Sequence, residues 1–198
     1  MTSKSNDIPA IKLETPSDAE IAAAIQTLSR LEKGRLPLDL FLQMARLATL
    51  STVELVPIRN KGTEAEVLLL QRDKDDKHWP NQWHVPGTVI IPTDSLAHPH
   101  DFSAPLGRLI GGDGEMKVGE GVSTVAPPVY IDTERRKTER GDEMAAIHYV
   151  EVEGEPVVGR FFSMDEFPNN VPEAGVIDHH RDFIPRVIAQ YMRNKGTK

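Results

Sequence analysis

The chain contains no cysteine, and this absence removes several kinds of chemistry at once. Without cysteine there is no disulfide, no thiolate nucleophile and no Cys-ligated zinc or iron–sulfur site. No apolar run approaches the roughly 18–20 residues that a membrane span needs. The opening residues 1–7 also lack the apolar stretch of a secretory signal. We therefore expect a soluble, cytoplasmic protein that has no membrane partner.

An excess of positive charge is missing as well. The chain has 23 Lys and Arg against 30 Asp and Glu, which gives a formal net charge of −7. Because surfaces that bind nucleic acid are normally basic, we expect no nucleic-acid partner. The 198 residues show no internal repeat and are 39% hydrophobic and 27% charged, as in an ordinary globular domain with or without an extension.

The first fifty residues predict two helices. Ser17 and Glu20 have the spacing of a capping box, and apolar residues recur behind them at helical spacing over 17–33. A second amphipathic segment covers 37–48. Each helix has one apolar face, so we expect both to pack on the domain that follows. Residues 1–50 are therefore interpreted as an N-terminal helical extension.

The periodicity changes where the second domain, 51–198, begins. The segments 53–58 and 67–72 are short and β-rich, and a turn sequence at 60–63 separates them, which predicts a hairpin. Pro57 lacks a backbone N–H, so we expect it at a sheet edge or at a bulge.

The remainder of the chain mixes strand patterns with one clear helix. A helical apolar face occurs over 177–191, where Pro185 requires either a first-turn position or a kink. Residues 92–118 show no clear period. This order predicts an α/β or α+β sandwich with a mixed sheet covered by helices. Further strand patterns occur at 83–91, 122–131, 145–152 and 157–162.

Residues 133–143 form a charged run of mixed sign. Four acidic residues offset four basic ones, so the run is not a nucleic-acid patch. We interpret it as a solvated hairpin tip between the strands predicted at 122–131 and 145–152.

The stretch 53–92 resembles the Nudix hydrolases. The shared features are the hairpin that ends Val-Leu-Leu-Leu-Gln-Arg at 67–72, a Trp-rich loop, and Trp-His-Val-Pro-Gly at 83–87. Residues 161–168 are similar to the family's segment between its last strand and its C-terminal helix. The resemblance covers about residues 51–193 and implies a Nudix-like α/β/α sandwich with a mixed β-sheet, plus the N-terminal extension.

The family's chemistry resides in a loop–helix motif whose glutamates hold Mg²⁺ or Mn²⁺, and this chain departs from that motif. Taking Gly87 as its first glycine places Thr93 where the first glutamate belongs. If an insertion lets Gly114 take the position of the motif's last glycine, residues 107–108 (Gly-Arg) occupy the positions of the motif's Arg-Glu pair. Residues 111–112 (Gly-Gly) then occupy the positions of its Glu-Glu pair. Since the metals neutralise the pyrophosphate and activate water, this departure implies a catalytic activity that is lost or much reduced.

Other side chains near the altered motif could supply oxygen ligands. Asp113, Glu115 and Glu120 are candidates for Mg²⁺ or Mn²⁺ if the protein is active, and Glu115 and Glu120 for catalysis. The alternative for these residues is a solvated turn among glycines. The sequence His98-Pro-His100-Asp could bind a transition metal, but an exposed insertion loop explains it as well.

Residues of three types favour ligand binding beside the implied cleft. Trp79 and Trp83 either stack on a nucleobase or sugar, or pack on the sheet and close the loop. Arg72 pairs either with a phosphate or with an aspartate of the following loop. Of His179 and His180, one is expected to face the cleft and assist a phosphate or a base, unless both belong to the surface or the helix start.

Three functions remain open at this point. The first is a Nudix-fold protein with little or no hydrolysis, whose cleft holds a nucleotide-like ligand or none. The second is an active Mg²⁺- or Mn²⁺-dependent pyrophosphohydrolase of nucleoside diphosphate derivatives that uses unconventional carboxylates. The third is a non-enzymatic scaffold whose helices 17–33 and 37–48 pair between two chains in a homodimer.

Overall fold

The computed structural model describes residues 15–31, 36–94, 101–111, 121–167 and 175–196. The chain divides into two units, residues 1–33 and residues 34–198, which are described separately. Among the described residues, no helix is both long and apolar enough to cross a membrane.

The first unit contains helix α1, Asp18–Leu28. The predicted capping box is confirmed, because the Glu20 N–H donates to Ser17 Oγ at 3.4 Å and the Ser17 N–H donates to Glu20 Oε2 at 2.8 Å. No residue of α1 is buried. Its apolar stripe stays exposed, with Ile25 at 62% and Leu28 at 44%.

In the second unit, helix α2 (Leu38–Leu47) precedes one mixed sheet of eight strands. The sheet order is β3-β2-β1-β7-β5, with β8 beside β2, β4 beside β1 and β6 beside β7. The long strand β1 pairs with β7 in parallel and with β2 and β4 antiparallel, so it lies at the centre. The strands are β1 Leu50–Asn60, β2 Ala65–Gln71, β3 Trp83–His84, β4 Gly87–Val89, β5 Val122–Thr124, β6 Val129–Thr138, β7 Gly141–Gly154 and β8 Arg160–Ser163.

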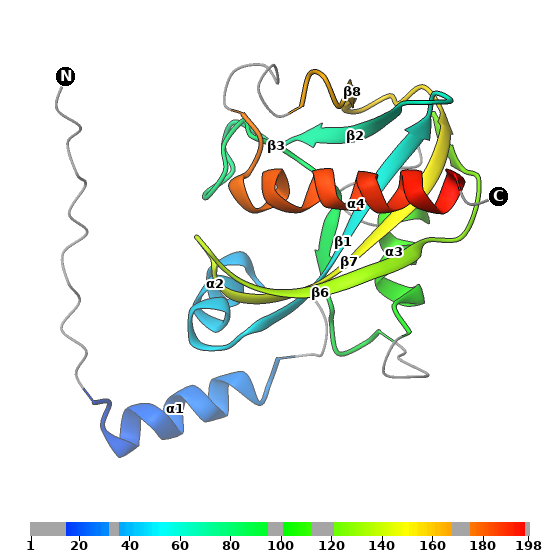
Figure 1. Cartoon of the computed structure of the whole chain (residues 1–198). Coiled ribbons are helices and arrows are strands. Elements are labelled where there is room, and N and C mark those ends of the chain that lie inside the picture. The colour runs from blue at the N-terminus through cyan, green and yellow to red at the C-terminus, as the bar shows by residue number, and fades with distance from the viewer. Residues whose placement is uncertain (1–14, 32–35, 95–100, 112–120, 168–174, 197–198) are drawn as a thin grey trace, which may run out of the picture. The chain divides into compact units, whose positions relative to one another are not determined.

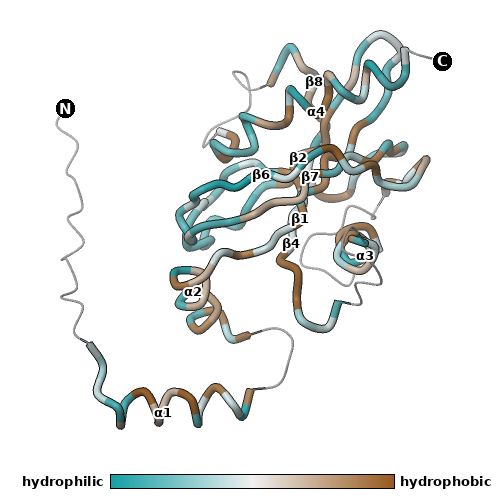
Figure 2. The backbone as a smooth tube through the Cα atoms, turned by 60° about the horizontal axis from the view of Figure 1, so that its bottom comes forward, coloured by the Kyte–Doolittle hydropathy of each residue, from teal (hydrophilic) through white to brown (hydrophobic). Residues whose placement is uncertain are grey.

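Two helices cover opposite faces of this sheet. Helix α4 (Asp178–Gly196) lies across the face that is in front in Figure 1, and Figure 2 shows α3 (Ser103–Gly111) on the other side of the strands. The alternation along β1 sets this arrangement, because Val56 packs in the cluster under α4 while Leu55 packs in the cluster under α3. The predicted α/β/α sandwich is therefore confirmed.

The predicted hairpin is confirmed by the pairing of β1 with β2, with Ile58 opposite Val67. The prediction for Pro57 is wrong, because this residue lies in the central strand opposite Val150 of β7. On the other side of β1, β4 pairs only as far as Glu54 and β2 begins at Ile58. The missing N–H of Pro57 faces this gap, so no ladder hydrogen bond is lost there.

Pro185 lies inside helix α4, in its third turn rather than its first.

Helix α2 approaches the start of β7 closely. Gly141 has φ of +138°, and a Cβ at this position would lie 2.3 Å from the Ala45 carbonyl oxygen. The contact between α2 and the hairpin therefore requires glycine.

Replacing Phe162 tests the α4-side core. Its side chain is fully buried, and its ring meets Trp83 edge-on at 5.1 Å between centroids. We expect Phe162→Ala to lower the free energy of unfolding by about 3–5 kcal/mol. Val157→Ala is the control, because Val157 is 70% exposed and should change it by less than about 0.5 kcal/mol. Similar losses in both variants, measured by urea unfolding, would contradict this core assignment.

Candidate ligand-binding site

A small polar pocket lies on the α4 face of the sheet. Its floor comes from β1 and β4, and its walls come from the loop after β2, the β6–β7 hairpin and the start of α4. The cavity measures about 30 Å³, room for a group of about the size of a water molecule. The lining residues are Thr52, Glu54, Arg72, Trp79, Gly87, Thr88, Val89, Arg140, Ile177, His179 and His180.

Trp79 lies beside two other candidates that the sequence predicted, Arg72 and His179, and beside Arg140, which the sequence did not predict. The guanidinium carbons of Arg140 and Arg72 lie 5.0 and 5.7 Å from its ring centroid, and the His179 ring meets it edge-on at 5.7 Å. Its indole N–H donates to Glu139 at 2.8 Å, and the side chain is only 4% exposed. In this arrangement Trp79 closes the loop over the pocket, and its faces are already covered by protein groups.

The other candidates fall in different places. Arg72 forms an ion pair with Asp76 at 3.5 Å, as the alternative from the sequence proposed, and still lines the pocket. Trp83 does not line it, because its ring packs against Phe162. Outside the described residues lie His98, His100, Asp113, Glu115 and Glu120.

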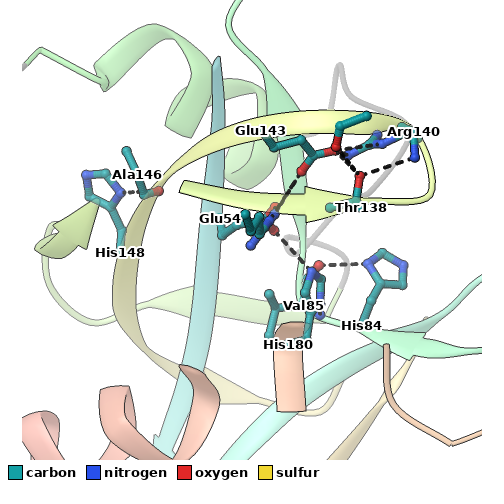
Figure 3. A network of polar contacts seen from close by, with 11 residues as sticks. Glu54, His84, Val85, Thr138, Arg140, Glu143, Ala146, His148 and His180 are labelled. Carbon is teal, nitrogen blue, oxygen red and sulfur yellow. Dashed lines mark hydrogen bonds and ion pairs between the residues drawn. The ribbon is translucent and has the colours of Figure 1, made fainter. Parts of the chain in front are cut away.

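Beside the pocket, two carboxylates are buried in a cluster of charges (Figure 3). Glu143 is fully buried, and both of its oxygens are used. Its Oε1 accepts from Arg140 Nη2 at 2.6 Å and from Thr138 Oγ1 at 3.1 Å, and its Oε2 accepts from Arg136 Nη2 at 3.2 Å. The same guanidinium donates to Glu54 Oε1 at 2.5 Å. We call these four side chains, Glu54, Arg136, Arg140 and Glu143, the buried charge cluster.

The hairpin predicted at 133–143 is confirmed by the pairing of β6 with β7, but the prediction that it is solvated throughout is wrong, because Glu143 is buried. These residues continue β6 and β7 to a short turn, and Arg136 stands opposite Glu143 in the ladder between the two strands. Strand alternation turns both side chains toward the α4 face, where each neutralises the other. On this face the mixed charge of the sequence reflects paired ions, whereas Arg135 on the opposite face is exposed.

The histidines next to this cluster are held neutral. His180 Nδ1 accepts from the Val85 N–H at 3.1 Å, which assigns the ring proton to Nε2. Burial lowers the pKa of His180 well below its usual value. Burial together with the Arg136, Arg140 and Arg72 guanidiniums lowers the pKa of His179 to about 3. Burial, aided by Arg72, also lowers the pKa of His84 to about 3.

The pKa of Glu54 is shifted in the opposite direction. Burial raises the pKa of its carboxyl, while the nearby Arg136 guanidinium acts against that rise. Figure 3 shows this side chain between the Glu143 end of the cluster and the His180 ring. The site therefore combines paired charges with neutral imidazoles at the pocket floor.

The described residues do not fit Mg²⁺ or Mn²⁺. Helix α3, the described part of the implied metal motif, carries no aspartate or glutamate. Across the described ranges, no three His, Asp or Glu side chains gather as a metal-binding group. Glu54 and Glu143 are already bound to guanidiniums.

A second, more apolar groove of about 520 Å³ lies on the α3 face. It is lined by α3 and by Phe102, Tyr130 and His148, whose rings contact one another. None of the ligand-binding candidates from the sequence lines this groove.

Comparison with known proteins identifies the fold. Neither the protein-family models nor the curated proteins give a match. Among solved structures, the chain is similar to the NUDIX domain of Shewanella oneidensis NrtR complexed with ADP ribose, at 16% identity and TM-score 0.51 over 84% of this chain and 97% of that one. It is also similar to a mutT/nudix family protein from Listeria innocua, at 14% identity and TM-score 0.51 over 75% and 97%. The chain therefore has a Nudix-like fold.

The buried neutral histidines predict a loss of stability in acid. In the unfolded chain each histidine binds a proton as the pH falls through about 6.5, whereas folded His84 and His179 bind one only near pH 3. Between these values the unfolded state holds more protons, so the free energy of unfolding falls as the pH falls. Each histidine contributes about 1.4 kcal/mol per pH unit in that window.

Urea unfolding at a series of pH values measures this slope. His179→Gln should reduce it by about the share of one histidine, since the neutral amide does not titrate. A free energy of unfolding that stays constant between pH 6.5 and 4 would contradict the assignment.

Proposed function

We propose that this protein binds a nucleotide-like small molecule, of the nucleoside diphosphate-linked class, in the pocket on the α4 face, and that phosphoanhydride hydrolysis is lost or much reduced. The observation that carries the proposal is the convergence of Arg72, Trp79, His179 and Arg140 on one pocket. The solved Nudix domain of NrtR, whose fold is similar, was crystallised with ADP ribose, which supports this class of ligand.

The charge distribution suits such a ligand. The side chains of Arg72 and Arg140 are 25% and 19% exposed, so their guanidiniums can reach a phosphate at the mouth of the pocket. The neutral His179 ring, which also lines the pocket, adds a hydrogen-bonding group without adding charge. With a net charge of −7, we propose that the partner is a free nucleotide rather than a nucleic acid.

Weak or absent hydrolysis follows from the missing ligands on α3, and it has a direct test. The purified protein is incubated at high concentration with nucleoside diphosphate-linked compounds and Mg²⁺ or Mn²⁺, and products are read by mass spectrometry. We expect no metal-dependent product. A product that disappears in the Glu115→Gln and Glu120→Gln variants would instead establish the alternative, an active pyrophosphohydrolase built on unconventional carboxylates.

Arg72 provides a test of ligand binding that is independent of turnover. Removing a guanidinium that pairs with phosphate should weaken nucleotide binding about tenfold, since a charge-assisted hydrogen bond contributes about 1.5–3 kcal/mol. We therefore expect a Kd about ten times higher for ADP-ribose in Arg72→Gln, measured by calorimetry. Arg135→Gln is the control, because this 69% exposed side chain does not line the pocket. Equal effects of the two substitutions would reject the pocket as the phosphate site.

A second candidate function is a dimeric scaffold, and the exposed stripe of α1 favours it. Ile21, Ile25 and Leu28 recur at helical spacing and are 43%, 62% and 44% exposed. Covering such a stripe with the same stripe of a second chain would remove apolar surface from water. We propose a homodimer through this helix, and light scattering at micromolar concentration measures its mass. A dimer that becomes monomeric in Ile25→Asp is expected, and a wild-type monomer would exclude it.

A further inference from the structure

Two buried polar atoms of β1 face the pocket without a partner. Thr52 Oγ1 and Glu54 Oε2 have no hydrogen-bond partner among the described residues. The two residues are 2% and 4% exposed, and both line the pocket. They lie two positions apart on one strand, so their side chains point to the same face of the sheet. A carboxylate oxygen and a hydroxyl are thus available together to a ligand group that enters the pocket.

The contrast with Glu143 shows that this arrangement is specific to Glu54. Glu143 has guanidinium or hydroxyl donors on both oxygens. Glu54 has Arg136 on Oε1 only, while its Oε2 lies 3.6 Å from His180 Nε2, beyond hydrogen-bond distance. Since buried acceptors normally have donors, the free oxygen indicates a place for an N–H or O–H group of a ligand.

Gly87 keeps that place open. It stands opposite Glu54 in the ladder between β1 and β4. A Cβ at residue 87 would lie 2.3 Å from Glu54 Oε2, so any side chain there would collide with the free oxygen. The glycine that opens the implied Nudix motif therefore also clears the approach to this carboxylate.

The hydrogen-bond donors and acceptors that line the pocket determine which ligand group can bind there. Glu54, held as a carboxylate by the Arg136 guanidinium on its Oε1, only accepts, His180 Nε2–H only donates, and the Thr52 hydroxyl does either. The two carboxylates and two guanidiniums of the buried charge cluster balance one another, and Arg72 adds a positive charge nearby. Because Arg72 is in turn paired with Asp76, the floor carries no net charge that would hold a cationic amine, so a neutral N–H donor beside an acceptor fits best.

The size of the cavity adds a second restriction. At about 30 Å³ it has room for a group as large as a water molecule but not for a heterocyclic ring. An exocyclic amino group is nearly as small as water and projects from its ring. It can reach Glu54 while the ring remains at the mouth beside Trp79 and His179.

We infer that Glu54 Oε2 and Thr52 Oγ1 recognise the exocyclic amino group of a nucleobase and its neighbouring ring nitrogen, as in adenine and cytosine. The amino group donates to Glu54, and the ring nitrogen accepts from Thr52 or from His180 Nε2–H. In the keto bases both groups reverse: the carbonyl oxygen presents an acceptor to Glu54 and the ring N–H presents a donor to His180 Nε2–H, so both contacts are lost and the base is rejected. This inference rests on the proposed function, whose ligand it narrows to amino-bearing nucleotides.

Matched ligand pairs test the inference on the wild-type protein. ADP and IDP differ at one ring position by amino against keto, and so do CDP and UDP at the corresponding position. We expect at least tenfold tighter binding of ADP than IDP, and of CDP than UDP, by calorimetry. Equal affinities within both pairs, as expected if water alone occupies the floor, would overturn the inference and leave the proposed function intact. Absence of binding by all four nucleotides would overturn both.

Glu54→Gln supplies a sharper test, because the amide keeps the shape of the carboxyl. With its oxygen retained by Arg136, the glutamine presents an N–H₂ donor where Oε2 lay. The preference should fall to equality or reverse toward IDP, while an unchanged tenfold preference for ADP would overturn the role of Glu54. Glu134→Gln is the matched control, since this β6 glutamate contacts Arg186 outside the pocket and should leave the preference unchanged. If the Glu54 variant does not fold, the wild-type ligand pairs decide.

Discussion

Two carboxylates, Glu54 and Glu143, lie in the interior on the α4 face, and each must be matched by positive charge because an unpaired buried ion is strongly destabilising. The matching guanidiniums come from Arg136 and Arg140 on the β6–β7 hairpin. Ion pairs therefore join the end of this hairpin to the central strand β1, and Arg140 of its turn forms one wall of the pocket. The same pairing leaves one oxygen of Glu54 facing that pocket. Thus the ion pairs that hold this hairpin in place also form the ligand site.

The sequence predicted the features that depend on local patterning. Apolar periodicity and the turn sequence at 60–63 were sufficient for the hairpin of β1 and β2 and for the mixed sheet covered by helices, and the Ser17–Glu20 spacing was sufficient for the capping box of α1. Three binding candidates, Arg72, Trp79 and His179, also meet at one pocket, because the loop after β2 and the start of α4 lie side by side there. Trp83 has a similar sequence context but packs against Phe162, since its position in β3 turns the ring into the core.

The features that depend on long-range pairing were missed. Arg136 and Glu143 lie in a mixed-charge run that is typical of solvent, and only the register of β6 against β7 and of β7 against β1 places them inside. Glu54 did carry a signal, because a single acidic residue interrupts the apolar run Val53-Glu54-Leu55-Val56 of a central strand. Pro57 was misplaced for a related reason: the gap between β4 and β2 that accommodates it exists only in the assembled sheet.

The central claim is that the ligand lies on the α4 face and not beside α3. These two faces carry separate cavities, one lined by Glu54, Trp79 and His179 and the other by Phe102, Tyr130 and His148. A crystal structure of the protein with bound ADP tests the claim most directly. The account predicts the adenine amino group within hydrogen-bond distance of Glu54 Oε2 and the phosphates beside Arg72 and Arg140. Nucleotide density in the groove beside α3, with the α4-face pocket unchanged, would contradict it.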